Sequence, residues 1–351
     1  MQVSVVMTVL DEAGTIRAVL DSLAAQTRPP DEVVVCDGGS RDGTPDILRE
    51  YAARLPMRVI ERPGANIAQG RNAAIAAACG DVIAVTDAGV RCEEAWLEKL
   101  IAPLTPALSP IRDGGEGAGE QGPHAVAGFF QSDPQTVFEI ALGATTLPEP
   151  RDVNPATYLP SSRSVAFRKE VWEAAGGYPE WLDFCEDVIF DLEVRRRFGP
   201  FVFVPEARVH FRPRASLRAF ARQYFLYARG DGKANLFPRQ HAVRYFAYLV
   251  VAPLLVYAAL AVNPWLWLAG LAAGLAYVRA PLRRIRPRLR PLSRLDRLCA
   301  LAWIPVIRVT GDLAKMIGYP AGVLWRLRQR PGMRRPPFDP TGPRLGGQGR
   351  T

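Results

Sequence analysis

The first 100 residues alternate between short apolar runs and segments with the hydrophobic spacing of helices. The predicted strands are 3–9, 32–36 and 57–60, and the predicted helices are 15–25, 44–54 and 65–78. A further stretch, 80–90, is apolar up to Asp87, which would end a strand. The alternative interpretation is that Asp87 only opens a turn. Strands that alternate with helices of this length predict an α/β fold with a mostly parallel, Rossmann-like sheet. In such a sheet the ligand chemistry lies at the carboxyl ends of the strands.

The next part of the chain continues the alternation after an interruption. Residues 105–121 are rich in Pro, Gly and Glu and lack apolar periodicity, which predicts a surface insertion without chemistry. Beyond it, the predicted strands are 125–130, 163–167, 201–204 and 207–211, and the predicted helices are 187–198 and 217–228.

The most apolar stretch, 245–278, contains no charged residue and is broken near its middle by Asn263-Pro264. Two straight membrane spans would need about 20 residues each, so the length favours a tight or re-entrant membrane hairpin. A buried helical pair of a soluble domain is the alternative. Aromatic residues near both edges favour the membrane.

Charge is distributed unevenly along the chain. Residues 239–351 carry 19 Lys and Arg against 3 Asp and Glu, whereas residues 1–238 carry 25 against 32. The basic excess lies beside the apolar stretch and not on a soluble, motif-bearing face, which favours a membrane over a nucleic-acid partner. Eight arginines between Arg279 and Arg297 predict a basic loop on the cytosolic side. Five cysteines without C-x-x-C spacing suggest neither a disulfide framework nor a zinc site, and reduced cytosolic thiols are expected.

A further apolar helix is predicted over 298–325. Arg308, Asp312 and Lys315 interrupt it at spacings of four and three, so one helical face carries all three. We therefore expect a helix that lies at the membrane interface or packs against the hairpin. The predicted organisation is a catalytic domain over 1–235, membrane-associated helices over 236–330, and a disordered tail over 331–351.

Five segments together resemble the inverting glycosyltransferases of glycosyltransferase family 2. They are 3–44 (beginning VSVVMTVLDE), 70–75 (GRNAAI), 80–89 (GDVIAVTDAG), 166–178 (AFRKEVWEAAGGY) and 185–199 (CEDVIFDLEVRRRFG). They occur in the order of the family and span roughly the first 230 residues. The resemblance implies a GT-A fold, a nucleotide-diphosphate sugar as donor, and transfer to an acceptor hydroxyl with inversion.

The resemblance also implies a donor site. Its members are Thr8, Leu10 and Glu12 along the nucleotide, Asp37 at the base, Arg71 at the base or phosphates, and Asp87 at the end of its strand. Strand-end carboxylates can accept hydrogen bonds from base N–H groups and ribose hydroxyls. The alternatives are that Asp37 forms only a turn and that Arg71 is only a surface residue at a helix start.

Asp187 is the candidate catalytic base, and Glu186 beside it either raises the local negative charge or binds the acceptor. Displacement at the anomeric carbon needs a carboxylate within hydrogen-bond reach of the acceptor hydroxyl. The alternative is that both residues only stabilise a helix N-terminus. The resemblance implies that Gln223 and Arg229 lie near the acceptor or the diphosphate. The alternative is that they belong only to an amphipathic helix on the membrane surface.

The metal site departs from the family pattern. Where the family usually carries Asp-x-Asp, this chain has Asp87-Ala88-Gly89, so the second carboxylate is missing. Mg²⁺ or Mn²⁺ would still suit a departing diphosphate, with Asp87 and His210 as candidate ligands. The alternative is that His210 is an ordinary, partly buried histidine that binds no metal. Arg71, Arg229 or Lys233 could supply part of the positive charge instead.

The sequence therefore predicts a membrane-attached glycosyltransferase with its catalytic domain on the cytosolic face and a lipid-linked or polysaccharide acceptor. One rival is a polyprenyl-phosphate glycosyltransferase, whose phosphate acceptor needs no general base. Another is a non-catalytic membrane scaffold with a degenerate metal site, for which Gly89 is the supporting feature.

Overall fold

A computed structural model of the chain describes residues 1–105 and 122–329, and the predictions for 106–121 and 330–351 lie outside the described residues. The chain forms two compact units. Among the described residues, the first unit comprises 1–131 and 150–211, and the second comprises 132–149 and 212–329. This division differs from the single boundary predicted at residue 235, because 132–149 and 212–235 join the later helices.

The first unit is built on a sheet of eight strands within the described residues, in the order β3-β2-β1-β4-β7-β6-β8-β5. The strands are β1 Val3–Val9, β2 Glu32–Asp37, β3 Met57–Glu61, β4 Val82–Val85, β5 Val90–Cys92, β6 Ala125–Ser132, β7 Val165–Arg168 and β8 Val202–Phe211. The helices of this unit are α1 Ile16–Ala24, α2 Thr44–Tyr51, α3 Ile67–Ala77, α4 Trp96–Ile101, α6 Lys169–Ala175 and α7 Glu186–Phe198, with 3-10 turns at Ala102–Leu104 and Pro150–Asp152.

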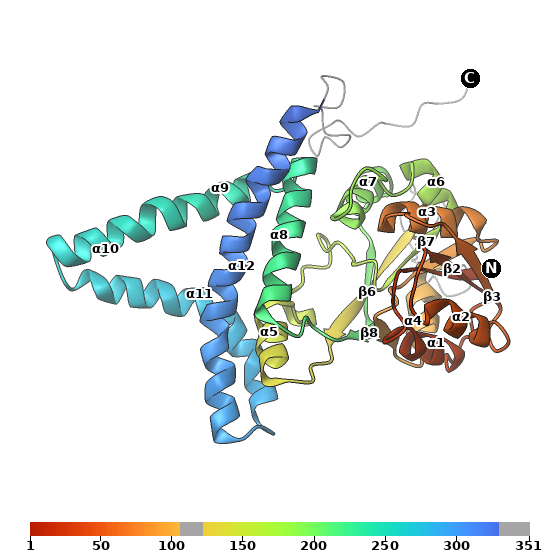
Figure 1. The fold of residues 1–351 in the computed structure, drawn as a ribbon, viewed down its shortest axis with the longest axis horizontal. Coiled ribbons are helices and arrows are strands. Elements are labelled where there is room, and N and C mark those ends of the chain that lie inside the picture. The colour runs from red at the N-terminus through yellow and green to blue at the C-terminus, as the bar shows by residue number, and fades with distance from the viewer. Residues whose placement is uncertain (106–121, 330–351) are drawn as a thin grey trace, which may run out of the picture. The chain divides into compact units, whose positions relative to one another are not determined.

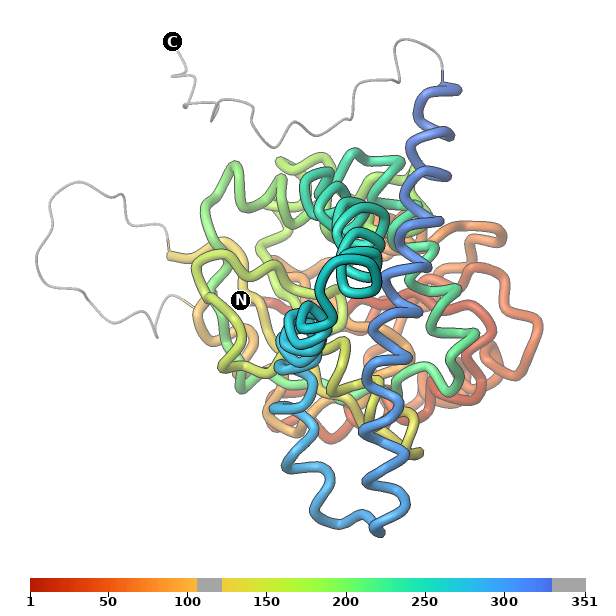
Figure 2. Tube along the Cα trace, turned by 90° about the vertical axis from the view of Figure 1, so that its left-hand side faces the viewer, coloured from red at the N-terminus to blue at the C-terminus, as the bar shows by residue number. Residues whose placement is uncertain are grey.

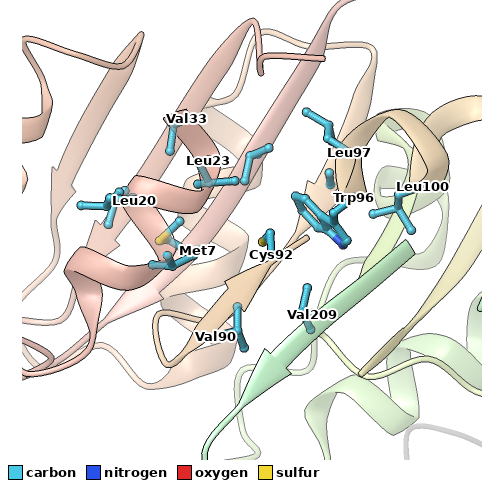
Figure 3. Close-up of a cluster of buried hydrophobic side chains, with 14 of the residues drawn as sticks. Met7, Leu20, Leu23, Val33, Val90, Cys92, Trp96, Leu97, Leu100 and Val209 are labelled. Carbon is cyan, nitrogen blue, oxygen red and sulfur yellow. The ribbon is translucent and has the colours of Figure 1, made fainter. Parts of the chain in front are cut away.

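The alternation of side chains along β1 explains why both faces of this sheet are covered. Val5, Met7 and Val9 lie in one buried cluster, while Val6 lies in another. Successive side chains of a strand point to opposite faces, so a strand that is apolar at every position needs a layer on each side. Figure 3 shows part of the first cluster. Met7 and Leu20 lie on one side of Cys92, and Trp96 lies on its other side.

The predicted α/β fold is confirmed, but the sheet is mixed. The pairs β1–β2, β2–β3 and β1–β4 are parallel, whereas β4–β7, β6–β7 and β5–β8 are antiparallel. The separate strands predicted at 201–204 and 207–211 are one continuous strand, β8, because Pro205 does not end it. A proline within a strand is tolerated where its missing N–H is not needed by the ladder. The run at 80–90 is also divided, since β4 ends at Val85 and β5 begins at Val90.

The second unit is helical. Its elements are α5 Val137–Thr146, α8 Leu217–Ala234, α9 Pro238–Phe246, the π-helical turn η4 Ala247–Val251, α10 Ala252–Ala261, α11 Leu266–Leu289 and α12 Arg294–Arg328. Figure 1 shows α8 and α12 side by side, and α10 and α11 as the two arms of a hairpin. The predicted helix 217–228 extends to Ala234, where Asn235 in the left-handed conformation ends it.

Glycines allow α8 and α12 to pack with their backbones in close contact. A Cβ on Gly318 would lie 2.2 Å from the carbonyl oxygen of Phe225, and a Cβ on Gly232 would lie 2.2 Å from that of Tyr319. Gly322 has the same relation to the carbonyl oxygen of Arg229, at 2.1 Å. No side chain fits at such distances, so this seam between α8 and α12 requires glycine at all three positions.

The hairpin of α10 and α11 exposes apolar side chains along its length, and Figure 2 views it from its tip. Leu260, Val262 and Trp265 near the tip are 72%, 74% and 76% exposed. In the part of the chain that the structure describes, Pro238–Ala261 is the one helix that is long and apolar enough to cross a membrane. Length and composition alone are weak support for such a crossing.

The charged face of α12 contacts the base of this hairpin. Asp312 accepts from Arg244 Nε at 2.8 Å and from the hydroxyls of Tyr248 and Tyr277. Arg308 donates to the backbone oxygen of Tyr277 at 3.0 Å. Two of the three charges that interrupt the apolar pattern of α12 are thus paired with hairpin residues or with the backbone.

We predict that Gly318→Ala destabilises the second unit, because its methyl group would overlap a backbone oxygen that the paired helix cannot move. The expected loss is about 1–3 kcal/mol in the free energy of unfolding, typical of overpacking. Gly274→Ala on α11 is the matched control, because no atom lies within 4 Å of its Cβ position. Thermal unfolding of purified protein would measure both, and an equal Tm for the two variants would contradict the tight seam.

Candidate functional site

The candidate site lies where three neighbouring strands end. β1, β2 and β4 are parallel neighbours, so their carboxyl ends meet at one edge of the sheet. Val9 at the end of β1 pairs with Asp37 at the end of β2. Asp87 lies two residues beyond the end of β4. The predicted donor residues from separate segments are thus gathered at one edge.

Asp37 shapes the loop that follows β2. It is buried, and its Oδ1 accepts from the N–H groups of Gly39 and Ser40 at 3.0 and 2.9 Å and from the Ser40 hydroxyl at 2.8 Å. This is the turn predicted as the alternative to base contact. Since only one carboxylate oxygen makes these bonds, contact of Asp37 with a nucleotide base stays a prediction.

The loop after β1 is tied to the same turn. Asp11 has a left-handed backbone with φ of +54°, its N–H donates to the Ser40 hydroxyl at 2.9 Å, and its carboxylate accepts from the N–H of Arg41 at 2.8 Å. Glu12 is held by Thr44, whose hydroxyl accepts from the Glu12 N–H at 2.8 Å. Leu10, which precedes these two residues, is 55% exposed. The loop is therefore fixed while Leu10 stays open to a ligand.

Thr8 explains a glycine in the neighbouring helix. A Cβ on Gly70 of α3 would lie 2.9 Å from Thr8 Cγ2, so any larger residue would push α3 away from β1. The close approach of α3 brings the next residue, Arg71, to the edge where the strands end. Thr8 is thus placed by the structure against α3, and its contact with a nucleotide stays a prediction.

Arg71 joins the strand end to the start of α7. Its side chain is 3% exposed and forms ion pairs with Glu186 at 2.9 Å and with Asp87 at 3.5 Å. The guanidinium also lies 4.8 Å from the centre of the Tyr178 ring, in cation–π geometry. The surface position considered for Arg71 is excluded, since it is a buried cation shared by two carboxylates.

Glu186 and Asp187 begin α7 directly after Cys185, whose left-handed backbone with φ of +67° turns the chain sharply into the helix. Burial, and then the charge of Asp187, raise the pKa of Glu186 to about 7, although Arg71 opposes this shift. Burial also raises the pKa of Asp187, which is opposed by Arg71. By whole-residue exposure Asp187 is partly buried and Glu186 is buried, so Asp187 is the more accessible of the two residues.

Two further residues of this region were not predicted as site residues from the sequence. Arg163 lies with Nε 3.7 Å from Asp87 Oδ2 and stacks 4.5 Å from the centre of the Phe211 ring. No sequence signal distinguishes this arginine, because it lies just before the family-like segment 166–178 and outside it. Asp191 follows Asp187 by one helical turn and is buried. Its spacing of four residues from Asp187 is the signal that could have found it.

The residues around Asp87 do not make a metal site of their own. Asp87 faces the two guanidinium groups of Arg71 and Arg163, and His210 contacts Glu93 at 3.0 Å. The described ranges contain no group of three or more His, Cys, Asp or Glu side chains that could hold a metal ion. Beside Gly89 the space is open, with no atom within 4 Å of its Cβ position. The second carboxylate of the family pattern would fit there, but this chain lacks it.

Gln223 and Arg229 lie on α8 in the second unit. Gln223 donates to the Tyr227 hydroxyl at 2.8 Å, and the backbone oxygen of Arg229 packs against Gly322. Their predicted role near the acceptor or the diphosphate stays a prediction.

Comparison with known sequences points to one enzyme family. Residues 4–108 match the model of Glycosyl transferase family 2. The succinoglycan biosynthesis protein ExoA of Rhizobium meliloti is 27% identical over 271 residues, which cover 75% of this chain and 79% of that protein. The glycosyltransferase AglE of Haloferax volcanii is 32% identical over 109 residues, covering 29% of this chain and 35% of that protein.

A solved structure shares the fold. The mannosyltransferase PcManGT of Pyrobaculum calidifontis, in complex with GDP-Man and Mn²⁺, aligns with a TM-score of 0.51 and 20% identity. The alignment covers 90% of this chain and 87% of that one. The predicted GT-A fold is confirmed.

We predict that Arg71→Gln lowers the free energy of unfolding near pH 7.5 by about 3–5 kcal/mol, because it leaves Glu186 buried without its cation. The loss should shrink as the pH falls through about 7, the pKa of Glu186, since Glu186 then takes up a proton and no longer needs a counter-charge. Urea denaturation across this pH range would measure both effects.

Arg17→Gln is the matched control, because Arg17 and its partner Glu50 are about half exposed, at 50% and 52%. An exposed pair of this kind contributes at most about 1 kcal/mol. If Arg71→Gln costs no more than Arg17→Gln, the buried ion pair does not stabilise this edge.

Proposed function

We propose that this chain, whose residues 4–108 match Glycosyl transferase family 2, transfers a sugar, with inversion, from a nucleotide-diphosphate sugar to a hydroxyl of a lipid-linked or polysaccharide acceptor. The observation that carries this proposal is the position of Asp187. Asp187 is a partly exposed residue at the start of α7, next to Glu186, which Arg71 links to the strand-end Asp87.

In the proposed reaction Asp187 accepts the proton of the acceptor hydroxyl. The acceptor oxygen forms a bond to the anomeric carbon as the bond from that carbon to the diphosphate oxygen breaks, and the diphosphate leaves with the electron pair. One carboxylate suffices for such a direct displacement, which inverts the anomeric centre. The raised pKa of Asp187 makes it a better proton acceptor than an ordinary aspartate.

The diphosphate gains negative charge as it leaves, and fixed cations stabilise this charge. Arg163 and Arg71 are the guanidinium groups beside Asp87, and we propose that they provide this stabilisation. A divalent cation, as in the PcManGT complex, would be held by Asp87, and phosphate and water would supply its other oxygen ligands. Because Gly89 supplies no second carboxylate, no step of the proposed mechanism depends on that ion.

A polysaccharide or its lipid-linked precursor is the acceptor class that we propose. ExoA, which is similar over most of its length, is a protein of succinoglycan biosynthesis, and succinoglycan is a polysaccharide. The exposed apolar hairpin supports attachment to a membrane, where lipid-linked intermediates reside. The arginine-rich end of α11 and the segment that follows it support a cytosolic position of the catalytic unit.

We predict that Asp187→Asn lowers the rate of sugar transfer by about 10²–10⁴-fold while the fold and nucleotide binding persist, because the amide cannot accept the proton. The donor is found first by screening nucleotide sugars for release of the nucleotide diphosphate. Glu170→Gln, which neutralises a carboxylate in the first turn of α6, is the control.

Each rival gives a different result in the same experiments. A phosphate acceptor needs no general base, so full activity of Asp187→Asn would favour a polyprenyl-phosphate glycosyltransferase. Failure to bind any nucleotide diphosphate in calorimetry, with and without Mn²⁺, would favour the non-catalytic scaffold.

We also predict that the full-length protein floats with vesicles that contain anionic lipid and that Leu260→Asp with Val262→Asp abolishes flotation. A charge at the centre of a bilayer costs about 3 kcal/mol on insertion scales. Both side chains are exposed, at 72% and 74%, so the substitutions should leave the fold intact. Leu295→Asp, equally exposed at 71% but outside the hairpin, is the control. Unchanged flotation of the double variant would exclude insertion of the hairpin tip.

A further inference from the structure

Asp191 is a buried carboxyl group that the proposed mechanism leaves unused. It lies on α7 one turn beyond Asp187 and is 2% exposed. Its Oδ2 has no hydrogen-bond partner among the described residues, and none of the ion pairs found in them includes Asp191. A buried carboxylate without a hydrogen-bond or ion-pair partner is costly, so its protonation state needs an explanation.

The cations near Asp191 are engaged with other groups. Arg71 on α3 pairs with Glu186 and Asp87, and Arg195 on α7 donates to the backbone oxygen of Thr157 at 3.2 Å. The remaining charged or titratable groups that act on Asp191 are Glu186, Asp187, Tyr158 and Tyr178. The two tyrosines are neutral at ordinary pH, and the two carboxylates repel a further negative charge.

We propose that Asp191 is a positioning residue that holds a proton at working pH, so that α7 adds no third negative charge to Glu186, which Arg71 pairs, and Asp187, which faces the acceptor. The inference rests on the proposed function for the role of Asp187, but the protonation of Asp191 stands on its burial and its unpartnered Oδ2. A neutral Asp191 places no negative charge beyond that of Glu186 beside the carboxylate that must take the acceptor proton. It also adds no repulsion to the approaching diphosphate of the donor.

The direction of the pKa agrees with this assignment. Burial, and then the charge of Asp187, raise the pKa of Asp191 well above its usual range. A carboxyl group whose folded pKa exceeds its unfolded value binds more protons in the folded state. The folded state therefore loses stability as the pH rises from about 4, the unfolded value, toward the folded pKa.

Asp191→Asn tests the proposal, because the amide has the shape of the protonated acid and cannot ionise. We expect the full-length variant to match the wild-type Tm near pH 4.5 and to exceed it by about 5 °C or more near pH 8, because only the wild-type unfolded state gains stability there by ionising residue 191. A lower Tm of the variant near pH 8 would overturn the proposal, since it would mean that an ionised Asp191 stabilises the fold.

Glu193→Gln is the matched control on the same helix. Glu193 pairs with Arg196 and Arg197. Burial acts to raise the pKa of Glu193, but the hydrogen bonds from the two arginines outweigh it and lower this pKa. Its neutralisation should therefore lower the Tm near neutral pH, opposite in sign to Asp191→Asn. If both variants shift the Tm in the same direction, a general effect of charge on α7 replaces the specific role of Asp191.

The pH profile of transfer separates a positioning role from a structural one. If Asp191 is neutral, Asp191→Asn leaves the pH at which activity rises on the acidic side unchanged to within about 0.3 units, because no charge beside Asp187 is removed. If Asp191 is ionised, its replacement lowers the pKa of Asp187, and the acidic side of the pH–activity profile moves to lower pH. This result would refute the proposal. An infrared difference spectrum near pH 7 gives an independent readout: wild type should show the C=O band of a protonated carboxylic acid that Asp191→Asn lacks, and absence of the band would also refute it.

Failure of this proposal is distinguishable from failure of the proposed function. The Tm and infrared measurements need no turnover, so they decide the protonation of Asp191 even if Asp187→Asn remains active. An active Asp187→Asn variant would remove Asp187 as the base without altering those two results.

Discussion

The buried guanidinium of Arg71 is the interaction on which the catalytic edge depends. A permanently charged group that is 3% exposed must be paired, and Arg71 is paired with both Glu186 and Asp87. These partners come from segments about 100 residues apart, one after β4 and one at the start of α7. The Thr8–Gly70 contact sets the distance between α3 and β1, and through it the place of Arg71. The packing of a methyl group against a glycine thus helps to set the geometry of the charges.

How much of the fold the sequence predicted depends on how local the signal is. The strands at 3–9 and 125–130 follow from runs of consecutive apolar residues, and the helix at 187–198 follows from the acidic residues at its start. The helix α5 was missed, since Val137–Thr146 is apolar nearly all round and has no amphipathic stripe to identify it. The antiparallel part of the sheet also follows from no local pattern, because strand direction is decided by long-range pairing.

The candidate site was predictable where a motif placed a residue at the end of an element. Asp37, Asp87 and Asp187 are of this kind. Arg163 was not predictable, because its relation to Asp87 arises only when β7 pairs with β4 and brings the preceding loop to the strand end. The pairing of Arg71 with Glu186 was equally invisible, since no spacing in the sequence relates residues 115 positions apart. Such contacts are properties of the folded chain and have no signature in either segment alone.

Gly89 gives the site an unusual freedom. Gly70 is demanded by its close approach to Thr8, whereas the space beside Gly89 is empty and its backbone avoids the left-handed region. Packing therefore places no constraint on the size of the residue at this position. An aspartate could occupy it without any rearrangement of its neighbours. One carboxylate or two at this edge is thus a difference of a single side chain and not of the fold around it.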